Sequence, residues 1–444
     1  MTSTKTKGSA MVRTRILAAL AAAALAVSGC TGPLQGVRVQ DAHGNTAGCA
    51  EPTAVPTGPL ARPTSFQLRC WASPPPPSIS PSPVVSVSQS PVPSPAGPLP
   101  NIRGGYYLGG NANMAADVAG MNLESFTQYR SLGSRLVFPG WEPSYGYLRP
   151  WVNGGVAGNF VVELVCFQTA DCAAKSFQVE GVTYVVPAGN SNRNHGGCGG
   201  RAQQASLGYG QLASGHLDGL LHTALAQTRE FTGPLVFHLY SEVDTDAECG
   251  TVEGGVFYDR TASNARAAAA AAYAISWLRN PCAFEPAPCT IAPAGPNVSF
   301  TVGMGGFHPT SYNQVYTPAV RGLVDFYNVN TYWRHAGSSW KTELGVDLAN
   351  VRKAGWPIHP VLITEFGTPV TAASGTWTTT QAARIEQFPA AVRDVNRAAD
   401  GDADVVIANY FNSNNAWATL NPKADGLAAL RRAYDDPLFS VQGE

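Results

Sequence analysis

Short apolar runs alternate with longer helix-like stretches from about residue 101 to the end of the chain. The runs are rich in Val, Ile, Leu, Phe and Tyr, which is typical of strands buried on both faces. The predicted strands are residues 104–110, 136–138, 159–167, 234–240, 298–302, 324–329, 361–363 and 405–408. The predicted helices are residues 123–134, 211–231, 262–279, 341–355, 380–399 and 424–434.

Strands that alternate with helices favour an α/β fold with a parallel sheet covered by helices. Eight such units in roughly 340 residues predict a (β/α)8 TIM barrel with insertions. A doubly wound open sheet is the alternative, and it usually has a glycine-rich phosphate turn after its first strand. The glycines near residues 104–110 do not form that GxGxxG pattern. We therefore expect the barrel, with a long insertion at about 168–206 beside its mouth.

The first 29 residues predict an export signal. Basic residues precede a short apolar segment, residues 16–27, and Ser28, Gly29 and Cys30 follow it. This order is that of a secretory signal peptide, which is too short to span a membrane. The end of the segment resembles the lipobox of bacterial lipoproteins, which implies that Cys30 is lipidated and anchors the protein to a membrane surface. An ordinary cleaved signal with a chance cysteine is the alternative.

Composition divides the rest of the chain into three parts. Residues 30–72 form a small segment that contains two cysteines. Residues 73–100 hold 11 Pro and 8 Ser and no charged residue, which predicts an extended linker. Residues 101–444 form the barrel domain. The linker would hold this domain away from the membrane.

Charge and cysteine content narrow the class of protein. The formal net charge is −1, so the chain lacks the basic excess that a nucleic-acid partner requires. Nine cysteines leave eight if Cys30 is lipidated, and exported proteins keep disulfides. A zinc site is the alternative, but the chain has no CxxC pair. Proximity along the chain suggests the pairs Cys49–Cys70, Cys166–Cys172 and Cys282–Cys289, leaving Cys198–Cys249.

Two glutamates follow predicted strands at positions suited to catalysis. Active sites of such barrels lie at the C-terminal ends of the strands. Glu242 follows the fourth predicted strand and Glu365 the seventh, so the two carboxylates would face each other across the mouth. Placing a carboxylate directly after an apolar strand costs free energy unless the group is solvated or has a function. The further acids Asp244, Asp246 and Glu248 leave a calcium site as an alternative, although the EF-hand spacing is absent.

Aromatic side chains crowd several of the other strand ends. Sugar rings stack on such faces, and a pair of carboxylates can cleave the bond between two sugars. These features together predict a carbohydrate-binding cleft. The candidate substrate-binding residues are Trp141, Glu142, His308, Tyr332, Trp333 and Trp417.

The domain resembles the clan A glycoside hydrolases, which carry an acid/base Glu after strand four and a nucleophilic Glu after strand seven. Residues 362–367, LITEFG, are similar to the nucleophile strand of many members. The clan usually has Asn before the acid/base residue, whereas this chain has Ser241. The resemblance implies that Glu365 is the nucleophile and Glu242 the acid/base residue of a retaining mechanism, with carboxyl groups about 5–5.5 Å apart.

The resemblance also implies roles for two aromatic residues. Tyr332 matches a hydroxyl that hydrogen-bonds the nucleophile, and Trp417 matches a tryptophan that underlies the cleaved sugar. No metal or organic cofactor is implied.

Three hypotheses follow for the whole chain. The first is a lipid-anchored retaining glycoside hydrolase at the bacterial cell surface, acting as a monomer on a polysaccharide. The second is a carbohydrate-binding barrel without catalytic activity, which is suggested by Ser241 at the position where the clan usually has Asn. The third is a structural or adhesion lipoprotein, which is suggested by the Pro/Ser-rich linker because such a linker suits display as well as catalysis. All three involve a membrane through the lipid anchor, and none involves a nucleic acid.

Overall fold

The chain divides into two units, one before and one after residue 93. The computed structural model describes most of the second unit and short strands of the first. The described residues are 39–40, 46–49, 53–54, 66–67, 70–71, 102–107, 121–132, 148–193, 204–285, 287–398, 404–411, 414–415, 418–419 and 424–439.

The first unit contains two small antiparallel sheets. One has the strand order β1-β2-β5, and the other pairs β3 with β4. Cys49 and Cys70 lie opposite each other in the β2–β5 ladder, as their predicted pairing requires. The predicted disulfide between them lies outside the described side chains. The strands are β1 (Val39–Gln40), β2 (Thr46–Cys49), β3 (Thr53–Ala54), β4 (Phe66–Gln67) and β5 (Cys70–Trp71).

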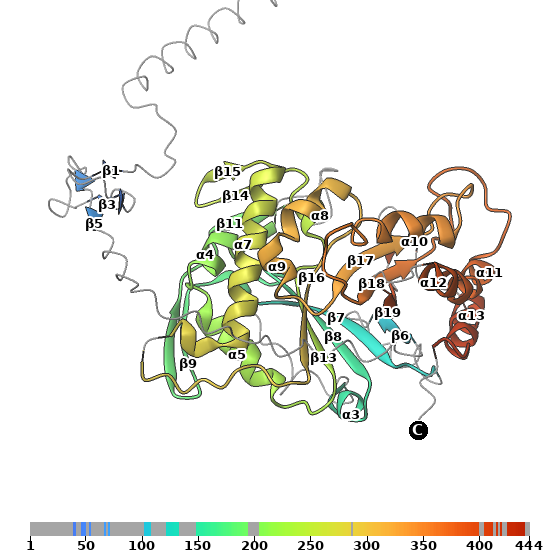
Figure 1. Ribbon diagram of the computed structural model, residues 1–444, viewed down its shortest axis with the longest axis horizontal. Helices are drawn as coiled ribbons and strands as arrows, with labels where there is room; N and C mark the ends of the chain where they lie inside the picture. The colour runs from blue at the N-terminus through green and yellow to red at the C-terminus, as the bar shows by residue number, and fades with distance from the viewer. Residues whose placement is uncertain are drawn as a thin grey trace, which may run out of the picture. The chain divides into compact units, whose positions relative to one another are not determined.

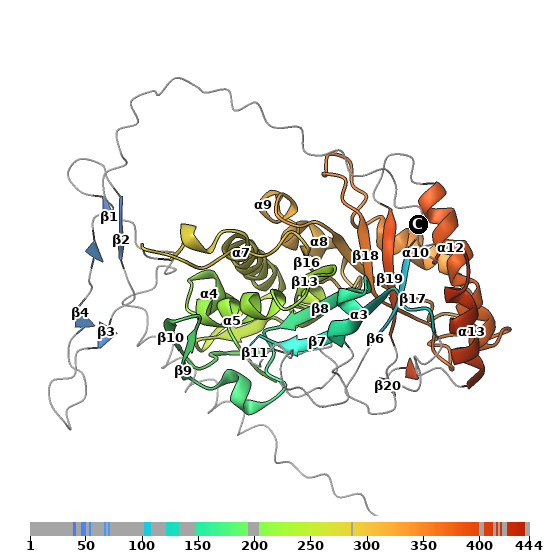
Figure 2. The ribbon, with the colours of Figure 1, turned by 90° about the horizontal axis from the view of Figure 1, so that it is seen from below.

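Eight parallel strands form the core of the second unit. Their order is β16-β13-β8-β7-β6-β19-β18-β17, with parallel pairing at every ladder. The sheet curls into a ring with helices outside it, so the predicted (β/α)8 barrel is confirmed (Figures 1 and 2). The strands are β6 (Arg103–Tyr107), β7 (Ser125–Ser131), β8 (Ala157–Glu163), β13 (Leu235–Leu239), β16 (Val298–Val302), β17 (Tyr327–Tyr332), β18 (Val361–Gly367) and β19 (Val405–Tyr410).

The ring closes between β16 and β17, where no regular ladder forms. The backbone N–H of Asp325 donates to the Phe300 carbonyl at 2.8 Å. The Thr301 hydroxyl donates to the Phe326 carbonyl at 2.8 Å, and the Asn328 amide oxygen accepts the N–H of Met304 at the same distance. Side chains therefore supply much of this seam.

One predicted helix is wrong. Residues 123–134 were expected to be helical, but residues 125–131 form β7, a central strand of the barrel. The reason is that its inward side chains, Ser125 and Thr127, are polar, so the segment lacks the continuous apolar run of a buried parallel strand. The predicted strand at 136–138 lies outside the described residues.

The barrel interior is apolar near the start of the strands and polar near their ends. Asn159 donates to the Thr127 hydroxyl at 3.0 Å, and its oxygen lies 3.2 Å from Nδ1 of His238. The Thr364 hydroxyl lies 3.2 Å from the same nitrogen. Burial lowers the pKa of His238 to about 3, so the ring is neutral. An apolar group of Ala157, Val236, Leu362, Val406 and Ile407 forms the other layer.

Helices cover the outside of the ring. In Figures 1 and 2, α5 and α7 lie beside β8, β13 and β16, whereas α10, α12 and α13 lie beside β17 to β19. The helices are α3 (Leu148–Asn153), α4 (Tyr209–Ala213), α5 (Asp218–Thr228), α6 (Val243–Asp246), α7 (Arg260–Arg279), α8 (Pro309–Val315), α9 (Pro318–Arg321), α10 (Trp340–Leu348), α11 (Gln381–Glu386), α12 (Phe388–Arg397) and α13 (Ala424–Tyr434).

Two long predicted helices are each divided. Residues 211–231 contain the end of α4 and the whole of α5, separated at Gly215, whose φ of 80° is incompatible with continuing a helix. Residues 380–399 contain α11 and α12, and Pro389 lies in the first turn of the second helix.

The insertion after β8 forms short strands beside the barrel. It contributes β11 and β12 to a four-stranded sheet of order β12-β11-β14-β15 and a separate β9–β10 hairpin. A hairpin of β20 and β21 follows the last barrel strand. These strands are β9 (Lys175–Val179), β10 (Val182–Val186), β11 (Ser191–Arg193), β12 (Gln204–Ser206), β14 (Thr251–Glu253), β15 (Val256–Tyr258), β20 (Asn414–Asn415) and β21 (Ala418–Thr419).

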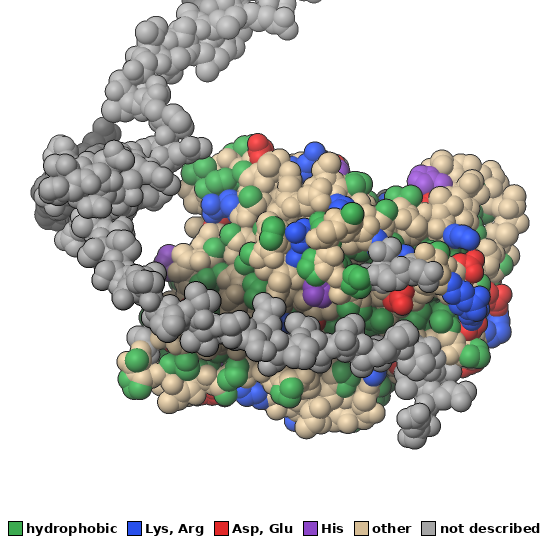
Figure 3. Space-filling view, in the orientation of Figure 1, with side chains coloured by type: hydrophobic (Ala, Val, Ile, Leu, Met, Phe, Trp, Pro, Cys, Tyr) green, Lys and Arg blue, Asp and Glu red, His purple; other side chains and the backbone are tan. Residues whose placement is uncertain are grey.

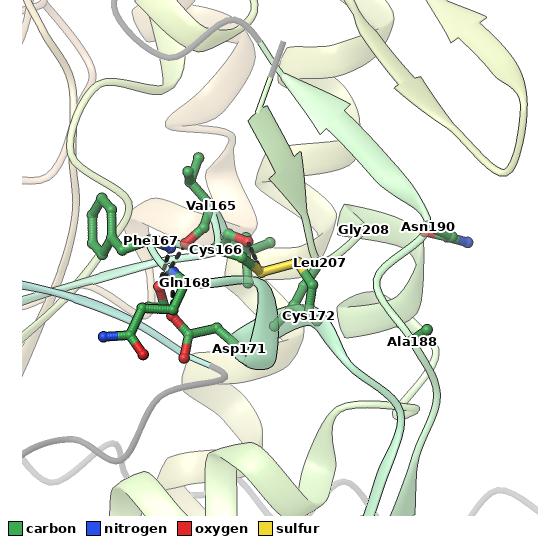
Figure 4. Close-up of a disulfide and its surroundings, with 12 residues drawn as sticks. Val165, Cys166, Phe167, Gln168, Asp171, Cys172, Ala188, Asn190, Leu207 and Gly208 are labelled. Atoms are coloured by element: carbon green, nitrogen blue, oxygen red, sulfur yellow. Dashed lines mark hydrogen bonds between the residues drawn. A yellow bond between two sulfur atoms is a disulfide. The ribbon is translucent and has the colours of Figure 1, made fainter. Parts of the chain in front are cut away.

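Two of the predicted disulfides are confirmed. Cys166–Cys172 closes the start of the insertion around the 3-10 helix η2 (Thr169–Cys172), as Figure 4 shows. Cys282–Cys289 closes the loop after α7, around a second 3-10 helix, η3 (Pro281–Ala283). Cys249 is also disulfide-bonded, and its partner lies outside the described side chains.

Charged side chains are sparse on the face in Figure 3, and several gather near α11 to α13. Ion pairs there include Arg393 with Asp436 and Arg432 with Glu386. Within the described part of the chain, no helix is both long and apolar enough to cross a membrane.

Gly105 offers a test of the polar interior. A Cβ at this position would lie 1.7 Å from Oδ1 of Asn409 and 2.1 Å from Oγ of Ser125. Because those two side chains bond each other at 2.6 Å, Gly105→Ala should lower the free energy of unfolding by about 2 kcal/mol or more. Gly345→Ala, inside α10 with open space around it, should instead raise it by roughly 0.5–1 kcal/mol. Urea denaturation measures both, and an unchanged Gly105→Ala midpoint would contradict the packing.

Candidate active site

Two carboxylates lie at the C-terminal ends of β13 and β18. Glu365 is within β18 and is 4% exposed. Glu242 follows β13, is half-buried and is the N-cap residue directly before the short helix α6. The C-terminal ends of parallel strands meet at one end of a barrel, so both side chains belong to its mouth.

Glu365 is held by two phenols from different strands. The Tyr332 hydroxyl of β17 donates to Oε2, and the Tyr129 hydroxyl of β7 donates to Oε1. Each carboxylate oxygen therefore has its own donor, which fixes the plane of the group. Tyr332 is the residue that the sequence proposed for this contact, whereas Tyr129 lies in the segment predicted to be helical.

Burial dominates the acidity of this site. It raises the pKa of Glu365 to about 8, while the two phenol donors act in the opposite direction because they stabilise the ionised form. Burial also raises the pKa of Tyr332 well above its ordinary value, and the charge of Glu242 adds to that rise. The Tyr332 hydroxyl therefore stays protonated and remains a donor.

Strand β17 also connects the two carboxylates. Asn330 donates from Nδ2 to Oε1 of Glu242 at 3.2 Å. Asn330 and Tyr332 are two residues apart on one strand, so their side chains point to the same face. Asn330 is also the ladder neighbour of Glu365. One strand face thus bonds both acids, Glu365 through Tyr332 and Glu242 through Asn330.

An unusual backbone turn precedes Glu242. Tyr240 is buried and has a φ of 62°, a left-handed conformation that is uncommon for an aromatic residue. Gly303 at the end of β16 approaches this turn so closely that a Cβ would lie 2.1 Å from the Tyr240 carbonyl oxygen. Ser241, at the position where the resemblance expects Asn, is 2% exposed. Such conformations persist where the surrounding structure over-determines them, often at functional sites.

Aromatic rings pack against the two phenols that hold Glu365. Phe307 and Phe411 pack against Tyr332. The Phe411 ring centroid lies 6.5 Å from those of Tyr129 and Tyr332, the two residues that hold Glu365. The Arg334 guanidinium lies 4.8 Å from the centroid of the Phe307 ring. This part of the mouth combines apolar ring faces with acids, as binding a sugar ring requires.

The other predicted site residues have different positions. Trp333 is 6% exposed and packs between Trp340 and Trp377 in the outer core, so the structure does not bring it to the carboxylates. The half-buried His308 lies on the loop after β16, with Nε2 3.5 Å from Glu248 and Nδ1 3.3 Å from Arg260. Four of the predicted residues lie outside the described residues: Trp141, Glu142, Trp417 and the lipidation site Cys30.

The sequence missed three contacts at the mouth. Tyr129 was missed with its strand, and Asn330 and Phe307 were not singled out. Their signals were present but weak: Asn330 precedes Tyr332 by two residues, which is the strand period, and Phe307 follows the fifth strand. These signals acquire meaning only once the strand boundaries are known.

The acidic run after Glu242 is partly explained. Asp244 is buried and accepts three backbone N–H groups, so its oxygens are directed to the protein itself. Among the described side chains, no group of three or more His, Cys, Asp or Glu could hold a metal ion. A surface cavity of about 510 Å³ beside the insertion is lined by neither candidate glutamate.

No protein-family model matches the chain, and no curated protein matches it. Similar solved structures include an endo-β-1,4-mannanase of Cellulomonas fimi, with 13% identity and a TM-score of 0.44 over 76% of this chain and 71% of that one. GH26C of a Muricauda species has 12% identity and a TM-score of 0.43, covering 76% and 86%. A GH128 endo-β-1,3-glucanase of Amycolatopsis mediterranei has 12% and 0.38, covering 75% and 99%. Similarities this low assign the chain to no family.

The buried acid should make stability depend on pH. The ordinary pKa of a glutamate is about 4.3, and that of folded Glu365 is about 8. The folded state thus binds a proton that the unfolded state releases, so this contribution is present below about pH 4 and is lost as the pH rises through 8. Glu365→Gln should therefore raise the free energy of unfolding by about 5 kcal/mol at pH 9 and by much less at pH 4.

Urea denaturation at the two pH values measures this effect. Glu386→Gln is the matched control because Glu386 is part of a surface ion pair with Arg432. The control should show no gain that grows with pH. An equal gain for Glu365→Gln at both pH values would contradict a raised pKa.

Proposed function

We propose that this chain is a retaining glycoside hydrolase that cleaves a polysaccharide or oligosaccharide. The observation that carries the proposal is the pair of acids held over one face of β17, with Tyr332 on Glu365 and Asn330 on Glu242. Two carboxylates at the end of a barrel among aromatic rings provide the acid, the nucleophile and the binding surface for glycosidic cleavage.

The two acids have different environments and therefore different roles. The ionised form of Glu365, which predominates above about pH 8, attacks the anomeric carbon while Glu242 transfers its proton to the leaving oxygen, and the carbon–oxygen bond breaks. Water then attacks the same carbon, Glu242 accepts the proton of that water, and the bond to Glu365 breaks. Tyr129 and Tyr332 support the role of Glu365, because their hydroxyls orient the carboxylate and stabilise its charge.

Asn330 supports the role of Glu242. Its Nδ2 donates to Oε1 of Glu242, which orients the carboxyl group that is to exchange a proton with the substrate. The half-buried position of Glu242 suits a group that must meet a leaving group and then a water molecule. Phe411 and Tyr332 supply apolar surface for the sugar ring beside Glu365.

A substrate panel tests this function. The wild type should release reducing ends from at least one of mannan, β-1,3-glucan, xylan, arabinan or bacterial wall glycan. Glu365→Gln and Glu242→Gln should each lower kcat by about a thousandfold or more, since a nucleophile or an acid/base group is removed. The first product should keep the anomeric configuration of the substrate, as proton NMR shows at early times.

Glu386→Gln is again the matched control and should keep full activity. Inverted product would overturn the retaining assignment. Full activity of Glu365→Gln would overturn the site. A folded wild type that binds a polymer but cleaves none would favour a binding module.

We also propose that the protein is lipid-anchored at the outer surface of a bacterial membrane. The support is the order of basic residues, apolar segment and small residues before Cys30. Cys30→Ala should move the protein from the membrane fraction to the soluble extracellular fraction and abolish incorporation of labelled fatty acid. Wild type that takes up no fatty acid would contradict the anchor.

A further inference from the structure

One buried carboxylate joins the segment that carries Glu242 to the loop after β16. Asp244 accepts the backbone N–H of Gly305 on Oδ1 at 2.5 Å. It accepts the N–H groups of Phe307 and His308 on Oδ2 at 3.0 and 3.1 Å. Asp244 is fully buried and lies two residues after Glu242.

The loop needs such an anchor. Between the end of β16 at Val302 and the start of α8 at Pro309, its sequence includes Gly303, Gly305 and Gly306. Glycine gives the backbone great conformational freedom, and Gly306 adopts a φ of 83°. Buried N–H groups outside a ladder must find other acceptors. A carboxylate surrounded by three N–H groups meets that need with charge-assisted hydrogen bonds.

The loop presents Phe307 to the mouth of the barrel. The Phe307 side chain is half-buried, packs against Tyr332 and lies below the Arg334 guanidinium. Tyr332 in turn donates to Glu365. Phe307 therefore contacts the residue that holds one acid, and its backbone is tied by Asp244 to the segment that carries the other.

We propose that Asp244 is a positioning residue that holds Phe307 as an apolar platform for a sugar ring next to the cleaved bond. The inference rests on the proposed function and deepens it, because a platform beside the acids implies an oligosaccharide substrate rather than a single sugar. Asp244 touches no substrate itself. It acts by keeping a glycine-rich loop in the one conformation that presents the Phe307 ring.

Amide hydrogen exchange tests the anchor without any substrate. In the wild type, the amides of Gly305, Phe307 and His308 should exchange slowly although they lie in a loop. Asp244→Asn should increase their exchange rates at least tenfold, because it removes the charge and places an NH2 group against N–H donors. The matched control is Asp259→Asn, which changes a helix-capping acceptor of the Ala262 N–H at the start of α7.

The control should leave the exchange of residues 303–308 unchanged. Fast exchange of the three amides in the wild type would overturn the proposal even if Asp244→Asn did not fold. Equal protection in Asp244→Asn and wild type would overturn it as well.

Kinetics test the platform. With the polymer identified by the substrate panel, Asp244→Asn and Phe307→Ala should each raise KM on the order of tenfold, the effect expected for a lost ring contact. The value of kcat should stay within about threefold. The double variant should be no worse than either single variant, because both remove the same platform.

The outcomes separate this inference from the proposed function. Additive losses, or a fall in kcat at unchanged KM, would overturn the role of Asp244 while leaving the glycosidase intact. A wild type without turnover would overturn the proposed function and with it the platform. The exchange measurement would still decide whether Asp244 anchors the loop.

Discussion

Polar side chains sealed inside the barrel have to bond one another, because each unsatisfied group would cost about 1–3 kcal/mol. Asn159 and Thr364 both lie within hydrogen-bonding distance of His238, so three strands that are distant in sequence are held in one register. The register of β18 shifts between Ile363 and Phe366, which allows Glu365 to face inward directly after Thr364. In β7, Tyr129 lies two residues after Thr127 and so shares its face. The position of the candidate nucleophile and its phenol donor is therefore a consequence of the layer beneath them.

The same layer explains where sequence reasoning succeeded and failed. A mostly apolar strand such as β13 was predicted to within one residue of its observed bounds. β7 was predicted as a helix because Ser125 and Thr127 face a polar interior and interrupt the apolar pattern. The sequence of that segment does not show that its polar side chains will form hydrogen bonds with Asn159 and Asn409, which lie far along the chain. β7 can thus be recognised as a strand only once its hydrogen-bond partners in the assembled barrel are known.

The candidate site divides in a similar way. Glu242 and Glu365 could be named from the sequence because an acid after an apolar strand needs a reason to be there. Tyr129 is separated from Glu365 by 236 residues, and its relevance appears only when β7 is placed in the ring. Trp333 shows the converse: it is adjacent to Tyr332, but successive residues of a strand face opposite ways, so it joins the outer core. The residue types suggested the chemistry of the site, whereas the alternation of side chains along each strand determined which of them lie in it.

The seam between β16 and β17 has a consequence for how such a barrel can diversify. Paired strands are kept about 4.8 Å apart by their ladders. Here backbone hydrogen bonds to the Phe300 carbonyl are joined by side-chain bonds of Thr301 and Asn328, so these side chains contribute to the spacing. The Phe307 loop begins just beyond one edge of this seam, and Asn330 and Tyr332 lie on the other. Replacing one seam residue by a longer or shorter one would change the width of the mouth without breaking any ladder. Point substitutions at this seam could therefore change the width of the mouth beside the acids and adapt it to ligands of different size.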